Sequence, residues 1–184
     1  MPSSTVIPDP RHWVQHHADP LYAYALARLD DEDLARDLVQ ETFLSALEQL
    51  GKFEGRSSER TWLIAILKYK IIAVYRKRSS TLSAHAEPEI EFFESDTGHW
   101  KDSYAPRPMQ LESPDPILDK ELAAILKRCM QQLPGLWRSV FTMKHIDDEE
   151  TGTICTGLKI TPSNLWVIIH RAKLNLRACI QKSW

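Results

Sequence analysis

Apolar side chains recur with the period of an α-helix between residues 31 and 50. The stripe consists of Leu34, Leu38, Thr42, Ala46 and Leu50, with Ala35, Val39, Phe43 and Leu47 beside them. Asp30 or Asp31 can cap the start of this segment, and Gly51 suits its end. The pattern predicts a helix of about five turns.

Two further helices are predicted on either side of it. Residues 10–29 carry apolar positions at helical spacing, and we expect this helix to be interrupted at, or to begin near, Pro20. A helix over residues 59–78 follows Ser57 and Ser58, either of which can cap it. Its apolar positions are Trp62, Leu63, Ile66, Leu67 and Ile71.

The C-terminal part of the chain predicts four more helices. They begin near Ile117, Pro134, Glu149 and Pro162, and a tight connection joins the last two. Thr161 is a good N-cap for the final helix, and Pro162 is a good first helical residue. The side chains that this helix is expected to bury are Leu165, Ile169, Ala172 and Leu176. The last two helices therefore predict a helix-turn-helix.

Residues 79–116 separate the two helical regions and show no sustained periodicity. The segment holds five of the eleven prolines, and so long an irregular stretch is typical of a linker. Phe92, Phe93 and Trp100 indicate that part of it docks on another surface.

The predicted fold is all-α, with two small helical domains joined by a flexible acidic linker. The domains are expected to cover residues 10–78 and 117–184, and the linker residues 79–116. Six glycines in 184 residues argue against a turn-rich β fold. No apolar run approaches the ~20 residues that cross a bilayer, and the N-terminus has no secretory signal. We therefore expect a cytoplasmic protein with no membrane insertion of its own.

Three cysteines, Cys129, Cys155 and Cys179, lie far apart and form no C-x-x-C pair. Zinc needs four ligands at suitable spacing, which these positions do not offer. We expect three small, buried apolar side chains in a reducing compartment, and no metal or other cofactor.

A net charge of −2 speaks against nucleic-acid binding, but the charges are segregated along the chain. Residues 61–78 hold five basic and no acidic side chains, and so do residues 159–184. Residues 79–119 hold nine acidic and two basic ones. The average therefore hides two basic segments that flank an acidic one.

The final helix has the side chains that a DNA-reading helix needs. In a helix-turn-helix the second helix enters the major groove, and the outward positions here are Ser163, Asn164, Val167, His170 and Arg171. Asparagine can bond adenine, serine can donate or accept, and valine can meet a thymine methyl. Arg171, Lys173 and Arg177 suit phosphate contacts. The alternative is an amphipathic helix with a solvated cationic face.

Residues 61–78 combine cations with the rings of Trp62, Tyr69 and Tyr75. Bases stack on rings while cations hold phosphates, which suits single-stranded or melting DNA. The alternative is a core ring followed by a solvated basic end, and Trp62 belongs to the core in either case.

Several stretches in series resemble the extracytoplasmic-function sigma factors of the sigma-70 family. Residues 37–43 (DLVQETF), 53–58 (FEGRSS) and 61–63 (TWL) look like sigma region 2. Residues 133–141, which begin with Leu-Pro and end with Val-Phe, and residues 160–172 look like sigma region 4. The resemblance implies an all-α subunit of RNA polymerase that recognises and melts promoter DNA, without catalysis.

The resemblance also implies a role for each group of residues. The surface that docks on the β′ clamp helices of the polymerase is matched by Asp37, Gln40, Glu41 and Phe43. The element that opens the minus-ten DNA is matched by Phe53, Gly55, Arg56, Ser57, Lys68, Tyr69, Arg76, Lys77 and Arg78. The minus-35 reader is matched by Thr161, Ser163, Asn164, Val167, His170, Arg171 and Lys173. Core RNA polymerase, including its β flap, and promoter DNA are the implied partners.

The chain departs from the family pattern in the helix-turn-helix. Glycine is common where Lys159 stands, so a matching turn would hold this lysine in a left-handed conformation, at a cost on the order of 1 kcal/mol. Basic residues are common where Trp166 and Ile168 occur, so duplex affinity without polymerase is expected to be weak. The resemblance also implies an anti-sigma factor, for which Trp166 is a candidate contact unless it packs within its own domain.

Two other classes of function remain open. A self-sufficient helix-turn-helix regulator would bind a duplex alone, without need of residues 61–78 or of the acidic linker. A pure interaction module would tolerate charge reversal at Arg76 and Arg78. An enzyme is least supported, because the chain has no phosphate-binding or nucleophile motif, and its N-terminal histidines form no site.

Overall fold

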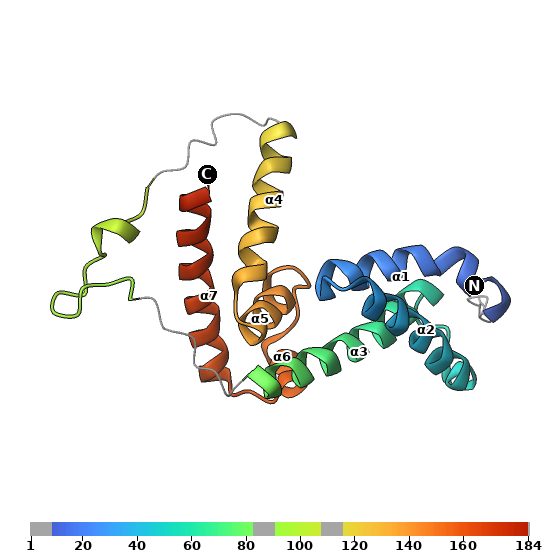
Figure 1. Ribbon diagram of the computed structural model, residues 1–184. Coiled ribbons are helices and arrows are strands. Elements are labelled where there is room, and N and C mark those ends of the chain that lie inside the picture. The colour runs from blue at the N-terminus through green and yellow to red at the C-terminus, as the bar shows by residue number, and fades with distance from the viewer. Residues whose placement is uncertain (1–8, 83–90, 108–115, 184) are drawn as a thin grey trace, which may run out of the picture. The chain divides into compact units, whose positions relative to one another are not determined.

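The computed structural model describes residues 9–82, 91–107 and 116–183, and in these ranges it contains helices but no β-strand (Figure 1). The predicted all-α fold class is confirmed. The chain divides into two compact units, Met1–Val74 and Tyr75–Trp184.

The first unit contains α1 (Trp13–Leu29), α2 (Glu32–Glu48) and most of α3 (Glu59–Leu82). Of the two predicted N-cap candidates Asp31 caps α2, because its carboxylate accepts a hydrogen bond from the backbone N–H of Leu34 at 3.0 Å, whereas Asp30 ends α1. Ser58 caps α3 in the same way, through the N–H of Thr61 at 3.2 Å.

The predicted interruption near Pro20 was wrong, since α1 runs through this proline. A proline inside a helix costs roughly 3 kcal/mol or more. The helix nevertheless buries Trp13 before the proline and Leu21, Ala25 and Leu29 from the proline onward. Each large buried apolar side chain contributes about 1.5–3 kcal/mol, so packing on both sides of Pro20 offsets the local cost.

Aromatic rings hold the three helices of this unit together. The ring centroid of Trp13 lies 6.4 Å from that of Phe43 on α2 and 5.9 Å from that of Trp62 on α3. Phe53, in the loop between α2 and α3, lies 4.9 Å from Trp62. One ring therefore anchors the loop to the core, while residues 54–58 are exposed.

The second unit contains α4 (Pro116–Gln132), α5 (Gly135–His145), α6 (Thr151–Leu158) and α7 (Pro162–Ser183). Helix α7 packs on the other three. The predicted core positions of α7 are confirmed, and Ile168 is buried with them. The predicted cap is confirmed too, because Thr161 Oγ1 accepts a hydrogen bond from the N–H of Asn164 at 3.2 Å.

Lys159 ends α6 in a left-handed conformation, as a turn that matches the family pattern requires. Its φ is 56° and its ψ is 45°, and its N–H donates to the carbonyl of Cys155. Two residues separate Lys159 from the start of α7, so this backbone conformation sets the turn of the helix-turn-helix.

Replacing Lys159 with glycine is expected to stabilise the second unit by on the order of 1 kcal/mol. Glycine adopts a positive φ without the contact between Cβ and the following carbonyl. Thermal or denaturant unfolding of the Lys159→Gly chain measures the gain. Lys159→Ala is the matched control: it retains Cβ, so an equal gain in both variants would show that loss of the lysine charge, and not backbone strain, is responsible.

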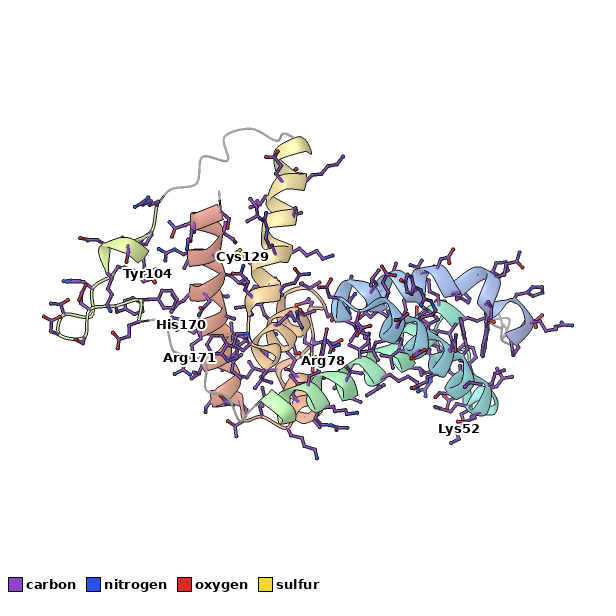
Figure 2. All side chains as sticks on the ribbon, viewed as in Figure 1. Lys52, Arg78, Tyr104, Cys129, His170 and Arg171 are labelled. Atoms are coloured by element: carbon purple, nitrogen blue, oxygen red, sulfur yellow. A yellow bond between two sulfur atoms is a disulfide. The ribbon has the colours of Figure 1, made fainter. Side chains whose placement is uncertain are left out.

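The described part of the acidic linker, residues 91–107, packs on α7, as the apolar side chains of this segment predicted. The guanidinium of Arg177 lies 4.3 Å from the ring centroid of Trp100 and donates to the carbonyl oxygen of Tyr104 at 3.2 Å. Figure 2 labels Tyr104 within this segment. Phe92 is buried against Tyr104, with the ring centroids 5.1 Å apart. The predicted linker positions 83–90 and 108–115 lie outside the described residues.

The expectation of three unpaired cysteines was wrong. A disulfide joins Cys129 on α4, which is labelled in Figure 2, to Cys179 on α7, and Cys155 is free. The pairing depends on two helices that lie side by side although 50 residues separate their cysteines. Sequence spacing carries no such information, because connectivity between distant cysteines follows from the fold.

Candidate functional site

One face of α2 combines acidic, amide and apolar side chains in solvent. Asp37, Gln40 and Glu41 are all exposed, as predicted. Leu44 follows at the same face and is 62% exposed, and Leu47 beside it is 48% exposed. An exposed pair of leucines within a polar rim is typical of a protein-binding surface.

Sequence reasoning missed Leu44 and placed Leu47 in the core stripe. The position of Leu47 was wrong because α2 needs only a narrow apolar face, which Leu38, Val39 and Ala46 fill. The spacing of the two leucines indicates that they face outward. Seven residues bring a helix back to nearly the same side, so Leu44 lies over Asp37 and Leu47 over Gln40.

Phe43 does not belong to that exposed face. It is partly buried and its ring packs on Trp13. Its contribution is therefore to hold α2 against α1.

The loop between α2 and α3 presents its polar residues to solvent. Gly55 has a φ of 69°, which favours glycine, and Arg56 pairs with Glu54 at 2.6 Å. Ser57 is exposed, whereas Phe53 is partly buried against Trp62. The loop thus has a fixed base and an exposed tip.

Helix α3 presents one prominent aromatic ring. Tyr69 is 75% exposed, while Tyr75 is buried and Trp62 partly buried. Arg76 lies seven residues after Tyr69, hence two turns along the same side of the helix, and it is exposed. This side of α3 therefore joins a ring to a cation.

The other predicted cations of α3 differ in their exposure. Lys77 is exposed, whereas Lys68 and Arg78, which is labelled in Figure 2, are partly buried. Lys70 is turned toward α2, with its Nζ 3.4 Å from Glu41 Oε2. This ion pair links the polar face of α2 to α3 within the first unit.

The predicted reading face of α7 is exposed throughout. Solvent reaches Thr161, Ser163, Asn164, Val167, His170, Arg171 and Lys173; Figure 2 labels His170 and Arg171. The core side chains Leu165, Ile168 and Ile169 lie on the opposite side of the helix. Polar groups and one small apolar group therefore stand together near the N-terminal end of the second helix of a helix-turn-helix.

Lysine and arginine supply the positive charge around this helix. Partial burial lowers the pKa of His145, and the charges of Lys173 and Lys144 lower it further. The imidazole therefore carries less positive charge at pH 7 than an ordinary histidine and adds little to the attraction of phosphates.

Trp166 does not pack in the core of its domain. It is 54% exposed, next to the exposed Val167. Arg177, in contrast, faces the linker segment and not open solvent, because it contacts Trp100 and Tyr104. It is therefore less available for phosphate than the sequence suggested.

The described residues contain no group of three or more histidine, cysteine, aspartate or glutamate side chains arranged to hold a metal ion. Among them, too, no helix has the length and apolar character needed to cross a membrane.

The protein is all-α, and two of its surfaces suit contact with nucleic acid. These are the outward polar face of α7 and the side of α3 that carries Tyr69 and Arg76. Residues 13–81 match the family described as Sigma-70 region 2. A probable RNA polymerase sigma factor of Haemophilus influenzae is 35% identical over 166 residues, which cover 88% of this chain and 84% of that protein. The ECF RNA polymerase sigma factor SigX of Bacillus subtilis is 37% identical over 65 residues, 35% of this chain and 33% of SigX.

One solved structure is also similar. It contains the sigma factor RpoE in complex with the anti-sigma factor NepR from Bartonella quintana, with a TM-score of 0.48 and 20% sequence identity over 93% of this chain and 96% of that one.

The chain belongs to the RNA polymerase sigma factors, in the extracytoplasmic-function group of the sigma-70 family. Sigma factors are regulators of transcription initiation: they bind core RNA polymerase and direct it to promoters.

Proposed function

We propose that this sigma factor divides its work between its two helical parts. Residues 10–78 bind core polymerase and open the minus-ten DNA, and residues 117–184 read the minus-35 duplex. Residues 79–116 connect the two parts and lie along the surface of the polymerase. The protein acts in the cytoplasm and catalyses no reaction of its own. The observation that carries the proposal is the exposed Tyr69 ring and Arg76 cation on α3, a helix whose Lys70 also pairs with Glu41 on the exposed polar face of α2.

The polymerase-binding face consists of Asp37, Gln40, Glu41, Leu44 and Leu47 on α2. The two leucines are about half exposed in the free protein, and covering the exposed part would contribute about 1–2 kcal/mol for each side chain. The acidic and amide groups set the orientation of the partner and favour a basic or polar surface on it. The β′ clamp helices of core polymerase are the proposed partner, and Phe43 supports the face from behind.

The minus-ten element is bound by the exposed tip of the α2–α3 loop and by α3. Tyr69 offers its ring to an unstacked base, and a base on an aromatic ring is worth roughly 1–3 kcal/mol. Arg76 and Lys77 contact phosphates, with Lys68 and Arg78 nearby on the same helix. In the loop, Phe53 and Gly55 fix the backbone so that Arg56 and Ser57 face the DNA.

The minus-35 element is read by the N-terminal half of α7. Asn164 and Ser163 have polar atoms for base edges, and Val167 suits a thymine methyl group. His170, Arg171 and Lys173 lie further along and position the helix on phosphates. Thr161 caps the helix, so its role includes holding this end in the correct shape.

Replacing Asn164 with alanine is expected to weaken discrimination at one base pair of the minus-35 element by about 1–3 kcal/mol, or roughly 5- to 150-fold. Transcription from promoters that carry every base at each minus-35 position measures the preference. The neighbouring Trp166→Ala chain is the control, since this ring lies outside the predicted reading positions. A uniform loss over all promoters would contradict the assignment of Asn164 as a reader.

An anti-sigma factor is a further proposed partner. The exposed Trp166 adjoins Val167 of the reading face, and a protein that covered this apolar pair would also block DNA. The β flap of the polymerase is proposed to contact the second unit as well.

Potassium permanganate probing tests the function directly, because it modifies unpaired thymines in melted DNA. We expect reactive thymines in the minus-ten region only when core polymerase and this chain are present together. Reactivity with core polymerase alone, or protection of a duplex by the chain alone with no melting, would contradict the proposal.

A further inference from the structure

The disulfide between Cys129 and Cys179 lies in a chain whose family acts together with RNA polymerase. Where RNA polymerase works, glutathione and thioredoxin keep most thiols reduced. Disulfides in such a compartment are usually transient and sense redox state or take part in catalysis. Nothing else in the described residues points to catalysis at this pair, so the remaining role is to sense the redox state.

The two helices hold the cysteines close enough to bond. Their Cα atoms are 5.8 Å apart, within the range that a disulfide requires. Cys129 belongs to a buried cluster with Met130, Leu133 and Leu176, so α4 and α7 also pack through apolar side chains. This packing does not depend on the bond, and it keeps the two thiols adjacent when the bond is open. Reoxidation is therefore an intramolecular step at high effective concentration.

The two sulfur atoms differ in access. Cys129 is 2% exposed, whereas Cys179 is partly exposed near the end of α7. Gln132 Oε1 lies 3.5 Å from Cys179 Sγ and can accept a hydrogen bond from the thiol when the bond is open. An external thiol or disulfide can therefore reach Cys179 before Cys129.

We propose that Cys129 and Cys179 form a reversible dithiol–disulfide site that couples the stability of the second helical unit to the thiol redox state of the cell. A low-molecular-weight disulfide such as oxidised glutathione is the oxidant. The Cys179 thiolate attacks one of its sulfur atoms, forms a mixed disulfide and releases one thiol. The Cys129 thiolate then attacks Cys179 Sγ and releases the second thiol. The pair loses two electrons and two protons, and the oxidant becomes two thiols.

The bond restrains the unfolded chain because it closes a loop whose ends are 50 residues apart. Oxidation should therefore raise the unfolding midpoint of the second unit by on the order of 10 °C. Helix α7 carries the proposed minus-35 reading face, so the reduced protein would lose that face at a lower temperature. This last consequence rests on the proposed function, whereas the bond and its effect on stability do not.

The test uses the full chain in buffers that span oxidised to reduced glutathione. After each equilibration, free thiols are alkylated and located by mass spectrometry. We expect Cys129 and Cys179 to change together from alkylated to linked as the buffer becomes oxidising, while Cys155 stays alkylated. Alkylation of Cys129 and Cys179 in the most oxidising buffer, a bond that persists in the most reducing one, or a link to Cys155 would each overturn the proposal.

Matched variants separate the bond from the packing. Cys179→Ala removes the partly exposed partner and leaves the buried Cys129 in the core, and Cys155→Ser leaves the pair intact. Melting of oxidised and reduced samples should differ for the wild-type and Cys155→Ser chains and should coincide for Cys179→Ala. Equal midpoints for the oxidised and reduced wild-type chain would overturn the coupling to stability. None of these readouts involves DNA or polymerase, so a failure of the proposed function would be seen separately.

Discussion

Replacing Leu44 and Leu47 together with aspartate is expected to lower the affinity for core RNA polymerase by at least about 100-fold. Covering the exposed part of the two leucines contributes roughly 1–2 kcal/mol each, and this is lost in the variant. Two carboxylates in an apolar contact add a desolvation cost. A loss of 3 kcal/mol or more corresponds to a factor above 100 in the dissociation constant. Fluorescence anisotropy of the labelled chain, titrated with core polymerase, measures it.

The fold of this variant should be unaffected, because both leucines are substantially exposed in the free protein. Thermal unfolding checks that point. Val14→Asp is the matched control: Val14 is an apolar residue of α1 in the same unit, 65% exposed and outside the α2 face. Wild-type affinity in the Leu44 and Leu47 variant, or an equal loss in Val14→Asp, would contradict a specific polymerase-binding face on α2.

Replacing Tyr69 with alanine is expected to reduce promoter opening by roughly 5- to 150-fold while polymerase binding stays normal. The ring is largely exposed and has no part in the core, so its removal should not unfold α3. The expected loss corresponds to the roughly 1–3 kcal/mol of one base stacked on an aromatic ring. Permanganate reactivity of the minus-ten thymines, measured with saturating holoenzyme, gives the fraction of open promoters.

Tyr69→Phe separates stacking from hydrogen bonding. It retains the ring, so promoter opening should remain close to that of the wild-type chain. Opening at the wild-type level in Tyr69→Ala would remove this residue from the minus-ten element. Equal losses in both variants would instead indicate that the hydroxyl group is responsible.

The helices of strongest periodicity could be predicted from the sequence. On α7, the apolar stripe, the threonine cap and the first-turn proline correctly predicted where the helix begins and which side it buries, because capping and periodicity are local properties. The same local argument failed at Pro20, where burial of Trp13 and Leu21 outweighs the cost of placing a proline inside a helix.

Contacts between distant segments could not be predicted. The bond between Cys129 and Cys179 and the contacts of Arg177 with Trp100 and Tyr104 depend on which helix faces which. The exposed side of α7 could be predicted, because one face of that helix is plainly apolar. It missed Leu44 because an outward leucine breaks the pattern, and such a break is itself a sign of a partner surface.

Run-off transcription by core RNA polymerase on genomic promoter fragments, with and without this chain, tests directly whether the protein directs the polymerase to promoters. We expect discrete transcripts that require the chain and that disappear when Arg76 and Lys77 are both replaced by glutamate, while Trp62 and the core remain intact. No chain-dependent transcript, together with tight binding of the chain alone to a DNA duplex, would contradict this expectation and would favour a self-sufficient helix-turn-helix regulator.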